Sequence, residues 1–290
     1  MNLRQPARAG SFYESSPSSC RHHAERLLAA AEPPDDLPRP LLGGLVPHAG
    51  WMYSGAIAAR TLRALLDGAD WQTVVLFGAD HTGAVRQGEV YDSGVWRTPL
   101  GDAAVDEQLA AEVIAAGDCC RANPDAHAAE HSLEVQVPLL QAIAPDARIL
   151  PIAVPPSPLA VTIGQTVAGA IAGRGGEVCL VGSTDLTHHA GHFPAPGGRG
   201  EVGERWTRAN DRRMLDLVEA MDAEAIVPEA TQHHNACGAG AVAATVAACK
   251  ALGARRGVCL EYDNSYTITH RKYPWELDDT TVGYAAVVFA

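Results

Sequence analysis

Positively charged residues are scarce in this sequence. Its 290 residues include 22 lysines and arginines against 34 aspartates and glutamates, which gives a formal net charge of -12. Proteins that bind nucleic-acid phosphates or anionic lipid surfaces generally need an excess of positive charge. The composition therefore predicts neither a nucleic-acid partner nor a membrane partner.

Long apolar runs are also absent. No stretch approaches the roughly 18 consecutive apolar residues that cross a membrane, and the first residues lack the apolar core of a signal peptide. We therefore expect a cytoplasmic protein. The seven cysteines are scattered without a CxxC pair, so the sequence predicts neither a disulfide framework nor a structural zinc knuckle.

Several catalytic motifs are missing as well. The sequence has no GxGxxG after a strand, no GxxxxGK(S/T) phosphate loop, no HExxH and no GxSxG. The last of these absences disfavours a serine hydrolase, because the nucleophile elbow of that class needs both glycines.

Short apolar runs alternate with helical patterns along the chain. Runs typical of buried strands occupy residues 43–46, 73–77, 148–154, 178–182, 257–262 and 282–289. Helical spacing of apolar residues occurs over 21–31, 56–66, 105–116, 133–143, 159–172, 209–219 and 239–252. This alternation predicts an α/β fold, a single domain over residues 1–290 with a mostly parallel central sheet and helices on both faces.

Two histidines stand just past strand-like runs, where open α/β sheets place their chemistry. They are His48, after 43–46, and His81, after 73–77. Cys237 opens an Ala/Val-rich helix, where the helix dipole favours a thiolate. Imidazole and thiolate both suit iron, copper and zinc, and three protein ligands leave positions open for substrate. We therefore expect a metal site, although the spacing alone also fits ordinary surface or core histidines.

A second polar cluster follows the run at 178–182. Asp185 and His188 are three residues apart, so on one helical turn the carboxylate would orient the imidazole for acid/base catalysis. His189 and His192 are expected to be solvated loop histidines.

Three further histidines lie close to the candidate residues in sequence. His131 precedes a predicted helix, where the alternative is that Ser132 simply caps the helix. His233 and His234 stand near Cys237 and could compete as ligands. The pattern leaves open whether any of the three joins the site.

Longer motifs make the sequence similar to one known family. They are PARAGSFY at 6–13, PHAGWMYSG at 47–55, GADH at 78–81, EHSLEVQVP at 130–138, STDLTH at 183–188, CG at 237–238 and VGYAA at 282–286. With these motifs the chain resembles, nearly end to end, the Memo family, whose bacterial members are called AmmeMemoRadiSam system protein B. The resemblance implies a fold similar to the class III extradiol dioxygenases, whose non-haem iron is held by two histidines and a carboxylate.

The resemblance also implies roles for individual residues. In the Memo family a cysteine takes the place of the carboxylate, so His48, His81 and Cys237 look like the metal ligands. Asp185 and His188 look like the polar pair that lines the pocket, and His188 would correspond to the acid/base histidine of the dioxygenases.

Two positions depart from the family pattern. Asp80 stands where the family usually has asparagine, and the loop at 233–236 is unusually rich in histidine. We expect the first change to add negative charge near the metal and the second to offer an extra ligand.

The resemblance and the site residues together favour a metal-dependent oxidoreductase. Fe(II) is the expected metal, with copper or zinc as alternatives, and the substrate is a small molecule that the sequence does not identify. A thiolate donates more charge than a carboxylate, which favours redox chemistry over hydrolysis. The alternative is a non-catalytic module that binds peptides or handles metal. The family context also implies radical-SAM and AMMECR1-like proteins as partners.

Overall fold

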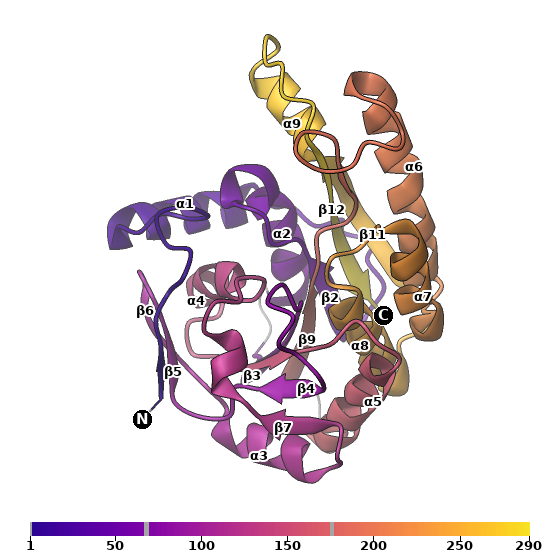
Figure 1. The fold of residues 1–290 in the computed structure, drawn as a ribbon. Coiled ribbons are helices and arrows are strands. Elements are labelled where there is room, and N and C mark those ends of the chain that lie inside the picture. Colours follow the sequence, from indigo (N-terminus) through magenta and orange to yellow (C-terminus); the bar gives the residue numbers. More distant parts are fainter. Residues whose placement is uncertain (1, 67–69, 175–176) are drawn as a thin grey trace.

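One large sheet forms the centre of the molecule. The computed structural model describes residues 2–66, 70–174 and 177–290. Within them, the main sheet has the strand order β10-β12-β2-β9-β3-β8-β4-β7, and β11 also pairs with β12 (Figure 1). Its strands are β2 Gly43–Val46, β3 Thr73–Gly78, β4 Gly88–Val90, β7 Cys120–Ala122, β8 Arg148–Ala153, β9 Val178–Ser183, β10 His188–His189, β11 Gly257–Asn264 and β12 Thr281–Phe289. A smaller sheet consists of β1 Leu3–Arg4, β5 Val95–Thr98 and β6 Gly101–Ala104.

The four strands at the centre of the main sheet run parallel. β2 pairs with β9, β9 with β3, and β3 with β8 in the same direction. β12 joins β2, and β4 joins β8, in the opposite direction. The predicted α/β class is therefore confirmed, with antiparallel strands added on both sides of a parallel centre. Strand direction was not predictable for 282–289, because a run buried on both faces reads the same in either direction.

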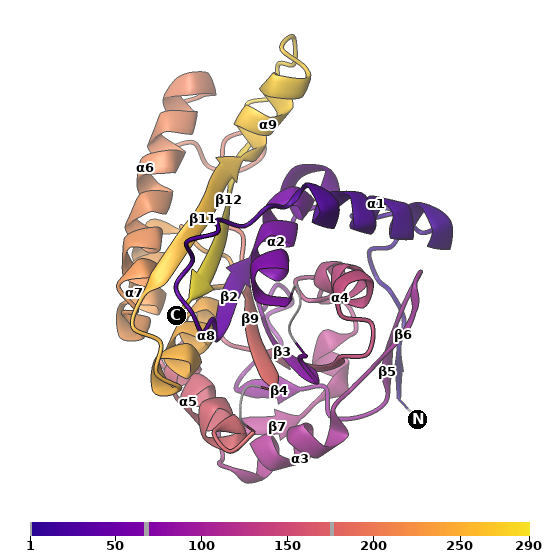
Figure 2. The ribbon, with the colours of Figure 1, turned by 180° about the vertical axis from the view of Figure 1, so that it is seen from behind.

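Helices cover both faces of the sheet, as the two opposite views show (Figures 1 and 2). They are α1 Pro17–Ala30, α2 Trp51–Leu66, α3 Glu107–Ala115, α4 Val137–Ile143, α5 Leu159–Ile171, α6 Gly200–Glu219, α7 Ala223–His233, α8 Ala239–Ala251 and α9 Ser265–Lys272, with 3₁₀ turns η1 Pro124–His127 and η2 Glu134–Gln136. Successive side chains of a strand point to opposite faces. Accordingly, Val74 and Leu76 of β3 share a buried cluster with α1, α2 and α4, whereas Val75 and Phe77 share one with α5 and α8.

The predicted strands are all present, with ends within two residues of the expected positions. The helices show larger differences. α6 begins at Gly200, nine residues before the predicted start, because its first turns are rich in glycine and charged residues and follow a glycine- and proline-rich segment that is typical of a loop. α7 was not predicted, since Pro228 inside it reads as a helix breaker. In the part of the chain that is described, no helix combines the length and apolarity that crossing a membrane requires.

Gly164 allows α5 and α8 to approach closely. A Cβ added to Gly164 would lie 2.1 Å from the carbonyl oxygen of Ala244. Alanine usually stabilises an open helix position by about 1 kcal/mol relative to glycine. At Gly164 we expect the opposite sign, a loss of about 2 kcal/mol in the free energy of unfolding, because the added methyl group forces the helices apart.

Urea denaturation of Gly164→Ala beside Gly169→Ala measures this difference. Gly169 lies in the same helix, and a Cβ there would have no neighbour within 4 Å. The control variant should therefore be slightly more stable than the wild type. Equal stabilisation by both substitutions would show that the two helices are not in this close contact.

Candidate metal centre

Three neighbouring strands bring polar residues to one edge of the sheet. His48 follows β2 and His81 follows β3, and β9 lies between these strands and leads to Asp185. The carboxyl ends of parallel strands meet at the same edge, which is where α/β proteins bind ligands. The positions predicted from the sequence for both histidines are therefore confirmed.

Cys237 reaches the same edge from the loop before α8. Its backbone N–H donates to the Asp185 carbonyl oxygen over 3.2 Å, and the N–H of Gly238 donates to Thr184 Oγ1 over 3.0 Å. A Cβ on Gly238 would lie 2.4 Å from the carbonyl oxygen of Ser183. Glycine after the cysteine is thus what lets the loop sit directly on the end of β9.

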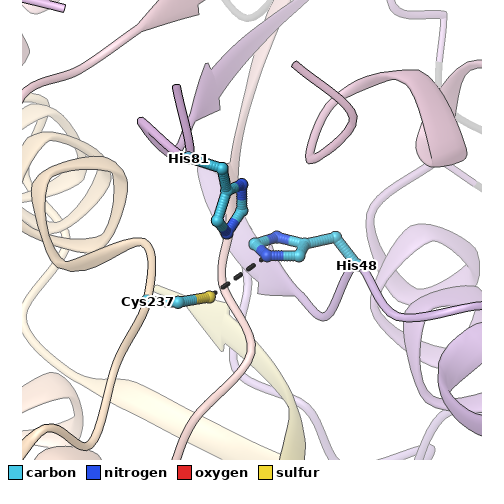
Figure 3. Close-up of side chains that lie close together, drawn as sticks. All are labelled: His48, His81 and Cys237. Carbon is cyan, nitrogen blue, oxygen red and sulfur yellow. Dashed lines mark hydrogen bonds between the residues drawn. The ribbon is translucent and has the colours of Figure 1, made fainter. Parts of the chain in front are cut away.

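The side chains of His48, His81 and Cys237 converge (Figure 3). Cys237 Sγ lies 3.1 Å from His48 Nε2, and one ligand atom from each of the three residues lies within 4.8 Å of the other two. Metal–nitrogen and metal–sulfur bonds of about 2.0–2.3 Å hold neighbouring ligand atoms at separations within this limit. The three side chains therefore fit a single metal ion.

Hydrogen bonding fixes the tautomer of His48. The Ser183 hydroxyl donates to the carbonyl oxygen of Ser132 over 2.8 Å, so its oxygen is free to accept from His48 Nδ1, 3.0 Å away. With the proton on Nδ1, the lone pair of Nε2 faces Cys237. Burial and the charge of the nearby His81 lower the pKa of His48 well below its usual range. His48 is thus held as a neutral imidazole, the form that binds metal.

Glu130 orients His81 through hydrogen bonds. Its carboxylate accepts from the backbone N–H of His81 over 2.8 Å and lies 2.9 Å from His81 Nδ1, and it also accepts from the N–H groups of His131 and Ser132. Burial raises the pKa of Glu130, but these hydrogen bonds outweigh burial and hold the pKa well below its usual range. A carboxylate that fixes a ligand histidine is a recurring feature of metal sites. The sequence analysis missed this role of Glu130, although the Glu-His pair at 130–131 was visible.

Cys237 is not held as the thiolate that its sequence position predicts. The helix begins at Ala239, two residues beyond Cys237, so Cys237 does not stand in the first turn. Burial raises the pKa of the Cys237 thiol, although a hydrogen bond to His81 acts in the opposite direction. The prediction of a dipole-stabilised thiolate is therefore wrong for the metal-free site, and a metal ion has to displace the thiol proton.

Asp185 and His188 do not form the predicted helical turn. The chain between β9 and β10 is irregular, and His188 pairs with Val282 of β12. The Asp185 carboxylate instead accepts from the backbone N–H of His48 over 2.7 Å. Burial raises the pKa of Asp185 to about 7 and lowers that of His188 to about 4. Asp185 thus fixes the backbone at His48, and it does not orient His188.

A cavity of about 440 Å³ opens onto the site. His48, His81, Asp185 and His188 all line it, so the predicted pocket residues do come together. Its other walls include Phe12, Tyr53, Phe193, Val282 and Tyr284. A cavity of this size and character is typical of a small-molecule site.

Nearly the whole chain matches one protein family. A family model described as "Memo-like protein" matches residues 4–288. The chain belongs to the Memo family. It is 33% identical to a MEMO1 family protein of Methanothermobacter thermautotrophicus, over 98% of this chain and 99% of the relative. It is 34% identical to one of Methanosarcina mazei, over 99% of both chains, and 32% identical to one of Methanopyrus kandleri, over 99% of this chain and 98% of the relative.

One of the three extra histidines joins the site of this Memo-family protein. His131 lines the cavity, and its ring is stacked against that of His81 with centroids 4.6 Å apart. His233 Nε2 lies 2.8 Å from a guanidinium nitrogen of Arg213, and His234 is exposed. Neither His233 nor His234 belongs to the groups whose ligand atoms converge among the described residues.

Two other expectations around the site are corrected. The Asp80 carboxylate accepts from the backbone N–H groups of Ala84 and Val85, so it fixes the loop after His81 and is not among the residues that line the cavity. His189 is buried, because β10 places it under α6. The burial of His189 could not be predicted, because β10 has only two residues and precedes a glycine- and proline-rich segment.

The N-terminal segment forms one wall of the cavity. Glu134 holds it in place by accepting from the backbone N–H groups of Ala7 and Arg8 and from the Tyr13 hydroxyl. Phe12 then meets the ring of His131 edge to face, with centroids 5.0 Å apart. The 130–136 segment therefore organises both the ligand histidine His81 and this wall of the cavity.

Proposed function

We propose that this protein is a metal-dependent oxidoreductase that holds Fe(II) through His48, His81 and Cys237 and acts on a small molecule. The observation that carries the proposal is the convergence of the three ligand atoms within 4.8 Å at a cavity, with both imidazoles held by further polar groups. Copper is the second candidate because it too combines imidazole and thiolate ligands with redox chemistry, whereas zinc would restrict the site to Lewis-acid chemistry.

Different groups at the site would have different roles in the reaction. A bound iron or copper ion would supply electron transfer and an open coordination position. His188 lines the cavity as a neutral imidazole at pH 7, so it can accept a proton from a substrate, and its pKa of about 4 means that it returns this proton readily. Phe12, Tyr53 and Tyr284 limit water around the reacting molecule. Asp185 keeps the His48 backbone in place during the reaction.

Binding of a phosphorylated peptide is less well supported. Recognition of a phosphate group usually relies on converging arginine or lysine side chains. Among the described residues, neither arginine nor lysine lines this cavity, and Asp185 and Asp278 would repel a phosphate when ionised. A metal-handling role without turnover is the other alternative. Measurement of dioxygen consumption distinguishes it from catalysis.

Dioxygen consumption by the iron-loaded protein, screened with catechols and other small phenols, tests the proposal. We expect substrate-dependent consumption that is absent from Cys237→Ser. His188→Gln should keep its iron but lose a factor of about 100 in rate, since positioned acid/base groups typically contribute 10²–10⁴-fold. Full iron loading without oxygen consumption for any compound would contradict the oxidoreductase proposal and favour metal handling. A His188→Gln variant of unchanged rate would remove His188 from the mechanism.

The expectation of a cytoplasmic location rests on the short apolar runs of the sequence, and that of radical-SAM and AMMECR1-like partners rests on the family resemblance. Both stay predictions.

A further inference from the structure

Two polar residues lie buried side by side in the middle of α6, which packs against β11 and β12 (Figure 1). Asn210 is 6% exposed, and Asp211 is fully buried. Asparagine and aspartate are poor helix formers, and a buried polar side chain needs hydrogen-bond partners to offset its loss of water. The partners of Asn210 and Asp211 therefore show what this pair holds in place.

The side chain of Asn210 joins two segments that are distant in the sequence. Its Nδ2 donates to Thr187 Oγ1 over 3.0 Å and to the carbonyl oxygen of His233 over 2.9 Å. The backbone carbonyl of Asn210 accepts from Nδ2 of the fully buried Asn235 over 3.0 Å. Asn210 thus ties the chain between β9 and β10 to the loop that leads from α7 to α8.

Each of these segments carries one group of the site. Thr187 directly precedes His188, which lines the cavity, and Asn235 stands two residues before Cys237. The backbone N–H of Cys237 also donates to the carbonyl oxygen of Asp185. The position of Cys237 relative to His188 therefore depends on the side chain of Asn210 as well as on this backbone hydrogen bond.

Asp211 fixes Thr187 from the same turn of the helix. Its Oδ1 accepts from the backbone N–H of Thr187 over 2.8 Å, and its Oδ2 accepts from the Tyr262 hydroxyl over 2.7 Å. The backbone N–H of Gly283 donates to the carbonyl oxygen of Thr187 over 3.1 Å, and a Cβ on Gly283 would collide with Asp211 Oδ2. Thr187 is thus held at its N–H, its hydroxyl and its carbonyl, and Asn210 ties the second segment to this fixed point.

We propose that Asn210 is a positioning residue that sets Cys237 against His188. It acts through Thr187 and the 233–235 backbone, and it is not itself one of the converging ligand residues. Without its amide donors, the two segments would move separately, and the sulfur and the imidazole would lose their fixed relative position. The consequence for metal binding rests on the proposed metal site, but the hydrogen bonds that carry the proposal do not.

Hydrogen exchange of the metal-free, full-length chain, followed by mass spectrometry, tests the proposal first. Asn210→Asp keeps the size of the side chain and removes both N–H donors. We expect exchange in 186–189 and in 234–238 to become about tenfold faster or more, the size of effect expected from losing these hydrogen bonds. Exchange in β3, at the centre of the sheet, reports any change in the stability of the whole fold.

Asn123→Asp is the matched control. It makes the same chemical change and removes an amide that donates to Glu89 Oε2 over 3.1 Å, away from the candidate metal centre. It should leave exchange in 186–189 and 234–238 as in the wild type.

Thr187→Val keeps the proposal testable if Asn210→Asp does not fold. It removes one of the two acceptors of the Asn210 amide and leaves the sequence of α6 unchanged. Exchange in 186–189 should become faster, whereas 234–238, which is still tied to Asn210 through His233 and Asn235, should change less.

Cobalt(II) loading measures the consequence for the site. A thiolate bound to Co(II) gives a charge-transfer absorption that reports the geometry of the sulfur ligand. Asn210→Asp should bind Co(II) about tenfold more weakly than the wild type, with a shifted or weaker absorption, as expected for loss of a group that supports a ligand. Asn123→Asp should match the wild type in both.

Unchanged exchange in both segments, or faster exchange with the cobalt affinity and absorption of the wild type, would overturn the proposal. Equal effects of Asn210→Asp and Asn123→Asp would overturn it as well. A wild-type protein that takes up no Co(II) would instead contradict the proposed metal site, and the exchange measurement would still decide whether Asn210 ties the two segments together.

Discussion

Replacing His48 by alanine is expected to abolish stoichiometric metal binding while the protein stays folded. Loss of a hydrogen-bond partner to a ligand histidine already costs about 10- to 100-fold in metal affinity, so loss of the ligand itself should cost more than about 100-fold. His48 is buried, and within the described residues its side chain hydrogen-bonds to Ser183 and Cys237 and contacts the rings of His81 and His131, all of them at the site, so removing it should cost the fold little. Metal content after dialysis against Fe(II), with circular dichroism as a check on folding, measures both effects.

His127→Ala is the matched control for this substitution. His127 is also fully buried, but its ring bonds to the backbone carbonyl of Glu89, and it does not line the cavity at the candidate metal centre. We expect it to lose stability and to keep its metal. If His48→Ala retains as much metal as His127→Ala does, the ion is bound elsewhere and the ligand assignment is wrong.

Glu130→Gln is expected to weaken metal binding by about 10- to 100-fold, the usual effect of removing a carboxylate that supports a ligand histidine. The amide oxygen of glutamine retains part of the hydrogen bonding to the N–H groups of His81, His131 and Ser132, but the negative charge beside His81 Nδ1 is lost. Competition with a chelator of known affinity gives the dissociation constants of the wild type and the variant.

The control for Glu130→Gln is Glu89→Gln. Glu89 is also buried and ionised, but it pairs with Arg121 away from the candidate metal centre. This variant should be less stable than the wild type and should bind metal with unchanged affinity. Equal affinity in Glu130→Gln and the wild type would mean that Glu130 is only a structural residue.

The central strands and the ligand histidines could be predicted from local sequence. Short apolar runs such as 73–77 are buried on both faces in a parallel sheet, so they are continuous in the sequence, and a polar residue just beyond them stands at the ligand-binding edge. Cys237 was chosen because it precedes an Ala/Val-rich helix, and the resemblance to a known family supported that choice. That resemblance is now supported by the match over residues 4–288.

The other features of the site depend on tertiary contacts, which the spacing of residues along the sequence does not encode. Asp185 and His188 are three residues apart, as on a helix, but pairing of His188 with β12 holds the segment extended. Glu130 acts on His81 from 49 residues away in the sequence, and Ser183 acts on His48 from 135 residues away. The pKa of Cys237 is controlled mainly by burial, which the position before a helix does not reveal.

The account is tested most directly by elemental analysis of the anaerobically purified wild-type protein, followed by X-ray absorption spectroscopy of the metal that is found. We predict about one metal ion per chain, as expected for a single three-ligand site. We also predict that its ligands include the sulfur of Cys237 and imidazole nitrogens of His48 and His81. A protein that holds no metal and takes up none from added Fe(II), copper or zinc, or a bound metal without a sulfur ligand, would contradict this account.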